Sequence, residues 1–195
     1  MTAQESDAAT PAPELDTTLL RRTLGAFATG VTVVSVGGAT PHGMTANSFT
    51  AVSLDPPLVL VCVVRTAYMH EALQSTGRFG ISVLSAEQEH VARHFANSRR
   101  PLGSQQFHVI DSRLGPLCGA PLISGAAANF ECELWRTYDG GDHTIFIGRL
   151  LSMTNGNDRD VLVFERGKFG RLERESLGGA AAPDGRCPPD GPVGA

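Results

Sequence analysis

The chain has 195 residues, 42% of them hydrophobic, and a formal net charge of −4. This length predicts a single domain with one substantial core. The acidic balance argues against nucleic acid or an anionic membrane as a partner, because both attract positively charged surfaces.

Residues 1–14 predict a flexible tail, because Ala, Thr, Pro and acidic residues without periodicity bury little apolar surface. The tail lacks the basic and apolar regions of a signal peptide, and no later run reaches the roughly 18 apolar residues that span a membrane. We therefore expect a cytoplasmic protein. Beyond the tail, Leu20, Leu24 and Phe27 recur at helical spacing and predict a helix over residues 17–28.

Residues 42–64, HGMTANSFTAVSLDPPLVLVCVV, are the stretch around which the fold is organised in our interpretation. A β-branched strand at 31–36 precedes it and closes with a Gly37-Gly38 turn. The second half, 58–64, is wholly apolar and predicts a strand buried on both faces. The first half carries neutral hydrogen-bonding groups that suit the wall of a site for a polar ligand: Thr45, Asn47, Ser48, Thr50 and Ser53.

Short helices are predicted on both sides of a strand at 79–84. The first helix ends at Gly77. Ser85 and the Gln three residues later have the spacing of a capping box, which predicts a helix over 86–97. Residues 98–125 are rich in Pro and Gly and predict a long loop. A loop of that length in a compact domain usually borders a functional site.

The second half of the chain predicts an antiparallel meander. Residues 128–135 alternate apolar and polar side chains, as a strand with one face on the core does. A turn at 138–141, a strand at 143–153, a turn at 155–158 and a strand at 161–165 follow. Antiparallel closure of these strands implies a barrel.

Residues 175–195 predict a disordered C-terminal tail, because Gly and Pro dominate them and do not build a packed core. The folded domain is therefore expected to span residues 15–174, between this tail and the N-terminal one.

Standard signatures of phosphate-cradle, metalloprotease and hydrolase sites are absent: the sequence has no G-x-G-x-x-G, P-loop, H-E-x-x-H or nucleophile elbow. Four widely spaced cysteines, without a C-x-x-C pair, predict buried free thiols rather than a zinc or redox site: Cys62, Cys118, Cys132 and Cys187. Five histidines have no partner at metal or triad spacing, so a surface or capping role is expected for them: His42, His70, His90, His94 and His108.

Four short motifs are more specific together than any one of them alone. They are TGVTVV at 29–34, GMTANSFT at 43–50, VSLDPP at 52–57 and GDH at 141–143. With them, residues 19–172 resemble the short-chain flavin reductases that supply reduced flavin to two-component monooxygenases. The resemblance implies an FMN-binding split barrel, that is, a mainly β, antiparallel Greek-key split β-barrel with a few short flanking helices, assembled as a homodimer.

The resemblance also implies an activity and a set of site residues. The activity is an NAD(P)H:flavin oxidoreductase that passes hydride from NADH or NADPH to FAD or FMN and hands the reduced flavin to a partner monooxygenase. Hydride passes directly between the two rings, so the protein's work is to stack them at reacting distance. His143 is the implied catalytic residue, as the group that positions the nicotinamide.

The flavin ring is implied near residues 45–48, and its phosphate end near Ser53 and the 63–66 turn, with Arg99 or Arg100 as additional donors. The complete set implied to bind the cofactors is Thr32, Thr45, Ala46, Asn47, Ser48, Ser53, Cys62, Val63, Val64, Thr66, Phe95, Arg99, Gly141, Asp142 and His143. No metal site is expected.

Some alternatives stay open. Similar enzymes usually carry Asn where Val64 stands, small hydroxyl residues where Tyr68 and Met69 stand, and a basic residue near Gln106. The sequence therefore leaves open FAD or FMN, NADH or NADPH, and a bound or a released flavin. From the residues alone, His143 reads as a turn residue and the two arginines read as solvated charges. A flavin- or haem-binding carrier or sensor on the same barrel is the alternative function.

Overall fold

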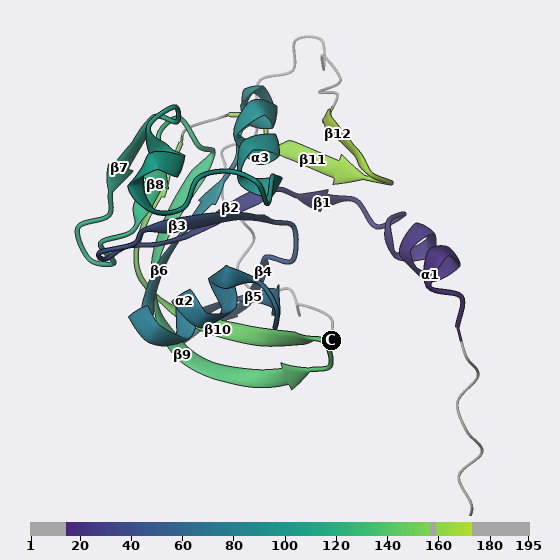
Figure 1. Cartoon of the computed structure of the whole chain (residues 1–195), viewed down its shortest axis with the longest axis horizontal. Coiled ribbons are helices and arrows are strands. Elements are labelled where there is room, and N and C mark those ends of the chain that lie inside the picture. Colours follow the sequence, from purple (N-terminus) through teal and green to yellow (C-terminus); the bar gives the residue numbers. More distant parts are fainter. Residues whose placement is uncertain (1–14, 157–158, 173–195) are drawn as a thin grey trace, which may run out of the picture.

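The computed structural model describes residues 15–156 and 159–172, and Figure 1 shows them as a strongly curled sheet with short helices around it. The helices are α1 (Thr17–Leu24), α2 (Tyr68–Thr76) and α3 (Glu89–Ala96), with the 3₁₀ helices η1 (Ala86–Gln88) and η2 (Gly103–Phe107). The strands are β1 (Thr29–Gly30), β2 (Thr32–Val36), β3 (His42–Ala46), β4 (Thr50–Leu54), β5 (Pro57–Val64), β6 (Arg78–Val83), β7 (Ser112–Leu114), β8 (Pro121–Ile123), β9 (Ala128–Gly140), β10 (His143–Asn155), β11 (Leu162–Glu165) and β12 (Lys168–Arg171).

Every strand pairing in this described part of the chain is antiparallel, which confirms the mainly β, antiparallel prediction. No helix among the same residues is long and apolar enough to cross a membrane. The predicted tails, 1–14 and 175–195, lie outside the described residues, and so does part of the turn predicted at 155–158.

Seven strands form the main sheet, in the order β3-β2-β6-β9-β10-β5-β4. Its two edge strands, β3 and β4, are consecutive in the chain and are separated only by residues 47–49. A linker of that length spans at most about 14 Å, so the sheet must curl until the end of β3 and the start of β4 lie within that distance. We call the line between β3 and β4 the seam. Ser48 lies in it, and its Oγ donates to the Cys62 carbonyl and accepts from the Cys62 N–H, both at 3.0 Å.

Two hydrophobic clusters form the core, and β2 contributes to both. Val34 and Val36 belong to the cluster that includes Phe79 and Phe146, whereas Val33 belongs to the cluster that includes Phe95 of α3. Consequently every residue of β2 is buried. Helix α2 covers the first cluster with Met69, Ala72 and Leu73, and α3 covers the second with Val91, Ala92 and Phe95.

The organising hairpin predicted at 42–64 needs correction. Its first half is two strands, β3 and β4, at opposite ends of the sheet order, and only β4 pairs with β5. The apolar strand β5 is not buried on both faces. Val59, Val61 and Val63 point into the core, whereas the intervening residues from Leu58 to Val64 are half-exposed. An apolar outer face on β5 therefore faces away from the core.

Other boundaries also differ from the prediction. The first helix ends at Leu24, where the Gly25 N–H bonds to the Arg21 carbonyl, so Phe27 lies beyond it. The supposed loop at 98–125 contains η2, β7 and β8. The meander stops at β10, because β11 joins β1 and β12 in a separate three-stranded sheet. The β9–β10 turn is tighter than predicted and consists of Gly141 and Asp142 only.

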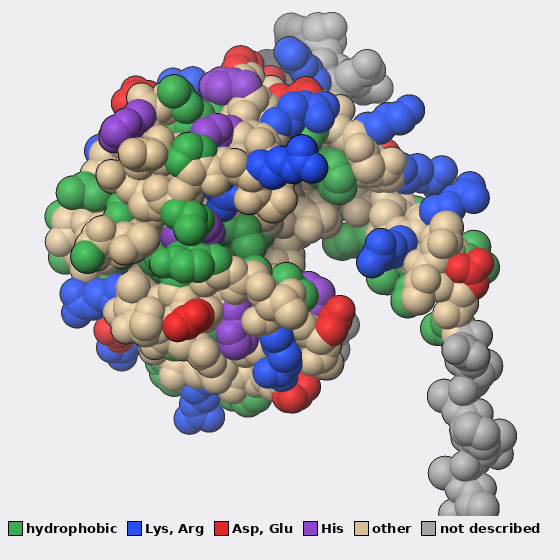
Figure 2. All heavy atoms as spheres, in the orientation of Figure 1, with side chains coloured by type: hydrophobic (Ala, Val, Ile, Leu, Met, Phe, Trp, Pro, Cys, Tyr) green, Lys and Arg blue, Asp and Glu red, His purple; other side chains and the backbone are tan. Residues whose placement is uncertain are grey.

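Helix α1 buries none of its residues. Figures 1 and 2 show it standing away from the body of the molecule, with apolar side chains on its surface. Leu24 is 65% exposed, and Phe27 just after the helix is 78% exposed. The helix begins regularly, because the Asp16 carboxylate accepts the N–H of Thr18 at 2.8 Å as an N-cap.

Candidate functional site

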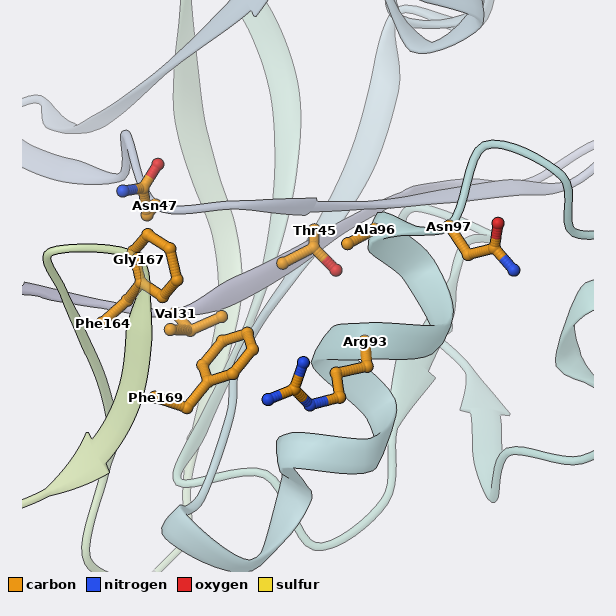
Figure 3. A pocket seen from close by; sticks show the side chains of 9 residues that line it. All are labelled: Val31, Thr45, Asn47, Arg93, Ala96, Asn97, Phe164, Gly167 and Phe169. Carbon is orange, nitrogen blue, oxygen red and sulfur yellow. The ribbon is translucent and has the colours of Figure 1, made fainter. Parts of the chain in front are cut away.

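Two neighbouring hollows open beside β3 and the C-terminal end of α3. Thr45 and Ala96 line both, so the two form one groove. The aromatic hollow, of about 460 Å³, is drawn in Figure 3 and is also lined by Val31, Asn47, Arg93, Asn97, Phe164, Gly167 and Phe169. The cationic hollow, of about 450 Å³, lies beside α2 and is also lined by His42, Met44, Thr66, Ala67, Tyr68, Met69, Phe95, Ser98, Arg100 and Leu102.

The aromatic hollow owes its character to the β11–β12 hairpin. Phe164 and Phe169 are register partners on that hairpin, with ring centroids 5.1 Å apart. Arg93 of α3 holds its guanidinium 5.0 Å from the Phe169 ring centroid, as Figure 3 shows from the side. Glu89 pairs with Arg93 at 2.7 Å and compensates its charge. These walls suit a flat, largely uncharged ring.

Two hydroxyls implied to bind a cofactor, one of them in the predicted ligand wall, are already engaged in the fold. Thr32 Oγ1 donates to the Ala46 carbonyl at 2.8 Å, and Thr45 Oγ1 donates to the Ala92 carbonyl at 2.7 Å. A hydroxyl has one proton to donate and two lone pairs, so each retains only acceptor capacity. These side chains therefore fix β3 against its neighbours. Asn47 is exposed at the rim of the aromatic hollow, so both the donor and the acceptor of its carboxamide are available to a ligand.

A close approach shapes the cationic hollow. A Cβ on Gly43 would lie 2.6 Å from Cε1 of Phe95 and 3.2 Å from Cζ of Phe107, so only glycine lets these rings pack on β3. Arg100 reaches the same stretch from beyond α3 and donates to the Gly43 carbonyl. His42 is 5% exposed, and burial together with the charge of Arg100 lowers its pKa to about 4. The surface role predicted for His42 is therefore wrong.

The GDH motif forms the β9–β10 turn, which is cross-linked to the end of β5. Gly141 adopts φ +77°, and its N–H donates to Asp139 Oδ1 at 2.9 Å. Arg65 contacts the turn three times: its N–H donates to the Asp142 carbonyl at 3.0 Å, its Nε to the Gly141 carbonyl at 3.0 Å, and its guanidinium to Asp139 Oδ2 at 2.8 Å. The turn is therefore held in one conformation.

His143 follows that turn and is half-exposed at the start of β10, directly opposite Val64 of β5. Its Nδ1 lies 2.7 Å from Asp142 Oδ1. The hydrogen bond from His143, followed by its charge, lowers the pKa of the Asp142 carboxyl. When Nδ1 donates to this carboxylate, Nε2 is left free to accept or, when protonated, to donate toward solvent.

The structure brings together some predicted site residues and separates others. Thr45, Asn47, Thr66 and Phe95 line the groove. Thr32 and Ala46 lie behind it, Ser48 and Cys62 pair at the seam, and Val63 is buried in the core. The set Val64, Gly141, Asp142 and His143 meets at the β9–β10 turn.

Two more predicted residues, Ser53 and Arg99, also lie apart from the groove. Ser53 pairs with Leu58, six residues from Val64 along β5, which is roughly 20 Å at strand spacing. The two predicted phosphate contacts therefore lie at opposite ends of β5. Arg99 is exposed and lines neither hollow, whereas Arg100 does.

Several residues that shape the site were not predicted from the sequence. They are His42, Arg65, Phe164 and Phe169, whereas Arg100 was implied only as an alternative to Arg99. For Phe164 and Phe169, the only signal in the sequence was the run of β-branched and aromatic residues around Gly167. No cluster of three potential metal ligands occurs among residues 15–156 and 159–172. Of the cysteines there, Cys118 and Cys132 are buried, Cys62 is half-exposed, and burial raises the pKa of all three thiols. Cys187 lies outside the described residues.

Comparison with known proteins gives consistent matches. Residues 24–173 match the family model of the flavin reductase like domain. An NADH-dependent FAD reductase of Streptomyces globisporus is 52% identical over 167 residues, which cover 86% of this chain and 92% of the relative. The reductase subunit HsaB of a flavin-dependent monooxygenase of Rhodococcus jostii is 36% identical over 174 residues, covering 89% of this chain and 87% of the relative.

Solved structures agree with these matches. BorF, the flavin reductase component of a bacterial two-component tryptophan halogenase, superposes with a TM-score of 0.79 at 54% identity, over 82% of this chain and all of that one. The Streptomyces globisporus NADH:FAD oxidoreductase SgcE6, in complex with NAD and FAD fragments, gives a TM-score of 0.79 at 49% identity, over 84% of this chain and 99% of that one.

Proposed function

Because the chain belongs to the flavin reductase-like domain family, we propose that its groove beside β3 and its β9–β10 turn together carry out hydride transfer from a nicotinamide to a flavin. The chain is an NAD(P)H-dependent flavin reductase with the split-barrel fold, and it supplies reduced flavin to a partner monooxygenase. Its cofactors are FAD or FMN and NADH. The activity and cofactors implied by the sequence motifs are thereby confirmed.

The observation that carries the mechanism is the character of the groove. Its walls are aromatic and apolar on one side, neutral and polar along β3, and cationic at the far end. A flavin nucleotide has the same three parts: a flat ring, a polar ribityl chain and a phosphate. The residues present therefore fit this group. When bound, the flavin accepts a hydride from the nicotinamide and carries it away in reduced form.

The chain's own residues supply binding and orientation. Phe164 and Phe169 give the ring an apolar face, and Asn47 offers its carboxamide to the polar ring edge. Thr45 keeps β3 at a fixed distance from α3 through its bond to Ala92. His143 positions the nicotinamide by a hydrogen bond from its exposed ring. Holding two reactants in a reactive geometry accounts for about 7–11 kcal/mol of barrier lowering in favourable cases.

Multiple turnover tests this function. Catalytic amounts of protein with excess FAD or FMN should oxidise NADH steadily, because the reduced flavin is reoxidised by air and returns as acceptor. A carrier or sensor would consume no more than one equivalent of NADH per protein and then stop. That stoichiometric stop would refute the reductase assignment for this chain. No observation in the groove favours the carrier alternative.

We further propose that the protein is a homodimer. Support comes from apolar surface that lacks a cover in one chain: the outer face of β5, Val52 and Leu54 of edge strand β4, and α1 with Phe27. Leu54 is 94% exposed. Exposed apolar surface of this kind marks an interface, and an isologous two-fold contact is the commonest way to bury it. Light scattering checks the mass in solution, and a monomer that still reduces flavin would contradict the proposal.

A further inference from the structure

Arg100 is a half-buried cation whose hydrogen-bond partners are all neutral. Its Nε donates to Gln106 Oε1 at 3.2 Å and its Nη1 to the Asn97 carbonyl at 2.8 Å. Its Nη2 donates to the Gly43 carbonyl and lies 3.2 Å from His42 Nε2. A guanidinium has five N–H groups, so these four contacts leave one for a ligand.

The neighbours of Arg100 hold it in place without compensating its charge. His42 is neutral above about pH 4, because burial and the Arg100 charge lower its pKa to about 4. Gln106 is completely buried and braced, since its Nε2 donates to the carbonyls of Pro41 and Gly103, both at 3.0 Å. Its Oε1 also accepts the Gly43 N–H at 3.0 Å. The guanidinium is therefore fixed in position before any ligand arrives.

Several other arginines differ from Arg100 in this respect. Arg65, Arg93, Arg149 and Arg166 each pair with a carboxylate, whereas Arg100 forms no ion pair within the described part of the chain. Burial also lowers the pKa of Arg100, because the charged form is desolvated. A desolvated, unpaired cation costs free energy that an arriving anion regains through charge-assisted hydrogen bonds.

Arg100 is also the one arginine or lysine among the described residues that line the cationic hollow. Thr66 and Ser98 line the same hollow and carry hydroxyls, which donate to phosphate oxygens. Guanidinium and hydroxyl groups facing one cavity are the usual partners of a phosphate ester. Met44, Phe95 and Leu102 make the rest of the wall apolar, so the bound ligand must bring its own negative charge.

We propose that Arg100 binds the phosphate ester of the flavin nucleotide and thereby makes the enzyme select FMN and FAD over riboflavin. This inference rests on the proposed function and adds the residue that reads the phosphate. The cation that contacts the phosphate is then Arg100 and not the adjacent Arg99.

Binding measurements without NADH test the proposal apart from turnover. Flavin fluorescence and calorimetry give dissociation constants for riboflavin, FMN and FAD with the full chain. Wild type should bind FMN and FAD about 10- to 100-fold more tightly than riboflavin, the range expected for hydrogen bonds to a charged group. Arg100→Gln should reduce that preference to about threefold or less and leave riboflavin affinity within about twofold. Arg100→Lys should retain an intermediate preference, because it keeps the charge but not the planar fork.

Arg99→Gln is the matched comparison, since it removes an adjacent charge of the same sign. A general electrostatic effect would appear in both variants, whereas direct contact appears only in Arg100→Gln. Salt gives a measurement that needs no variant: raising it from about 50 to 500 mM should weaken FMN binding and spare riboflavin.

Several results would overturn the assignment. One is equal wild-type affinity for riboflavin and FMN, and another is equal weakening of all three flavins by Arg100→Gln. A third is unchanged flavin affinity of Arg100→Gln with weakened NAD⁺ binding, which would mean that Arg100 binds a phosphate of the nicotinamide nucleotide. Steady NADH oxidation by the wild type would leave the reductase function standing in each case, and its absence would remove that function instead.

Discussion

Replacing Arg65 with methionine is expected to impair NADH use without impairing flavin binding. The change removes two of the contacts that fix the β9–β10 turn, the Nε bond to the Gly141 carbonyl at 3.0 Å and the ion pair to Asp139 at 2.8 Å. Two others remain, the Arg65 N–H to the Asp142 carbonyl and the Gly141 N–H to Asp139. The turn should therefore persist but sample more conformations, and the proposed nicotinamide contact of His143 should weaken with it.

The size of the effect follows from exposure. The side chains of Arg65 and Asp139 are 43% and 81% exposed, so their ion pair is worth about 0–1 kcal/mol after solvent screening. The bond to the Gly141 carbonyl adds about 1 kcal/mol. If half or more of this total is needed to orient His143, the KM for NADH should rise about 2- to 30-fold. The dissociation constant of the flavin should stay within about twofold, because Arg65 lines neither hollow.

Arg149→Met is the matched control on the same hairpin. Arg149 forms an ion pair with Glu133 and lies 5.8 Å from the Trp135 ring centroid, away from the turn. Its loss should lower the melting temperature about as much as the loss of Arg65 while leaving the KM for NADH unchanged. Steady-state kinetics with varied NADH at saturating flavin, beside calorimetric melting curves, measure both quantities. Equal KM values for Arg65→Met and wild type, or equal increases in both variants, would refute the positioning role.

Three further predictions concern single side chains. His143→Ala should lower kcat/KM for NADH about 3- to 100-fold with flavin affinity within about twofold; much weaker flavin binding with normal NADH use would move His143 to the flavin site. Val61→Ala, fully buried, should cost about 1–3 kcal/mol in urea unfolding, whereas Leu60→Ala on the outer face should mainly weaken dimer formation in sedimentation; the opposite order would mean that β5 faces the other way. Gly43→Ala should cost about 1–3 kcal/mol in the same unfolding assay, because its Cβ would meet Phe95 at 2.6 Å, and an unchanged midpoint would show that the ring yields freely.

The sequence predicted the features that short-range patterns encode. The capping box at Ser85 is present, with both of its hydrogen bonds, and the alternation after Ala128 is a strand that packs Cys132 into the core. Gly141 and Asp142 form a tight turn, as the Gly-Asp chemistry indicates. Each of these depends on neighbours within a few residues, which the sequence displays directly.

What the sequence did not predict depends on contacts between distant segments. The outer face of β5 is as apolar as its inner face, so composition alone made the strand look buried on both sides. Arg99 and Arg100 are adjacent and chemically identical, and only the positions of His42 and Gln106 show which one turns into the groove. Two hydroxyls implied to bind a cofactor serve the fold instead, because Thr32 and Thr45 donate to backbone carbonyls that lie 14 and 47 residues away.

The seam between β3 and β4 has a consequence for amide exchange. Along it β3 and β4 are not paired with each other, and the Ser48 side chain bonds to Cys62 of β5 rather than across to β3. Amide protons at such edges exchange with solvent sooner than those inside the sheet, because local opening there breaks few bonds. A flavin lying over Thr45 and Asn47 would cover this line directly. Deuterium uptake across residues 43–54 should therefore fall when flavin binds and recover when reduced flavin departs. Amide exchange at these two edge strands would then measure how much of the protein has flavin bound.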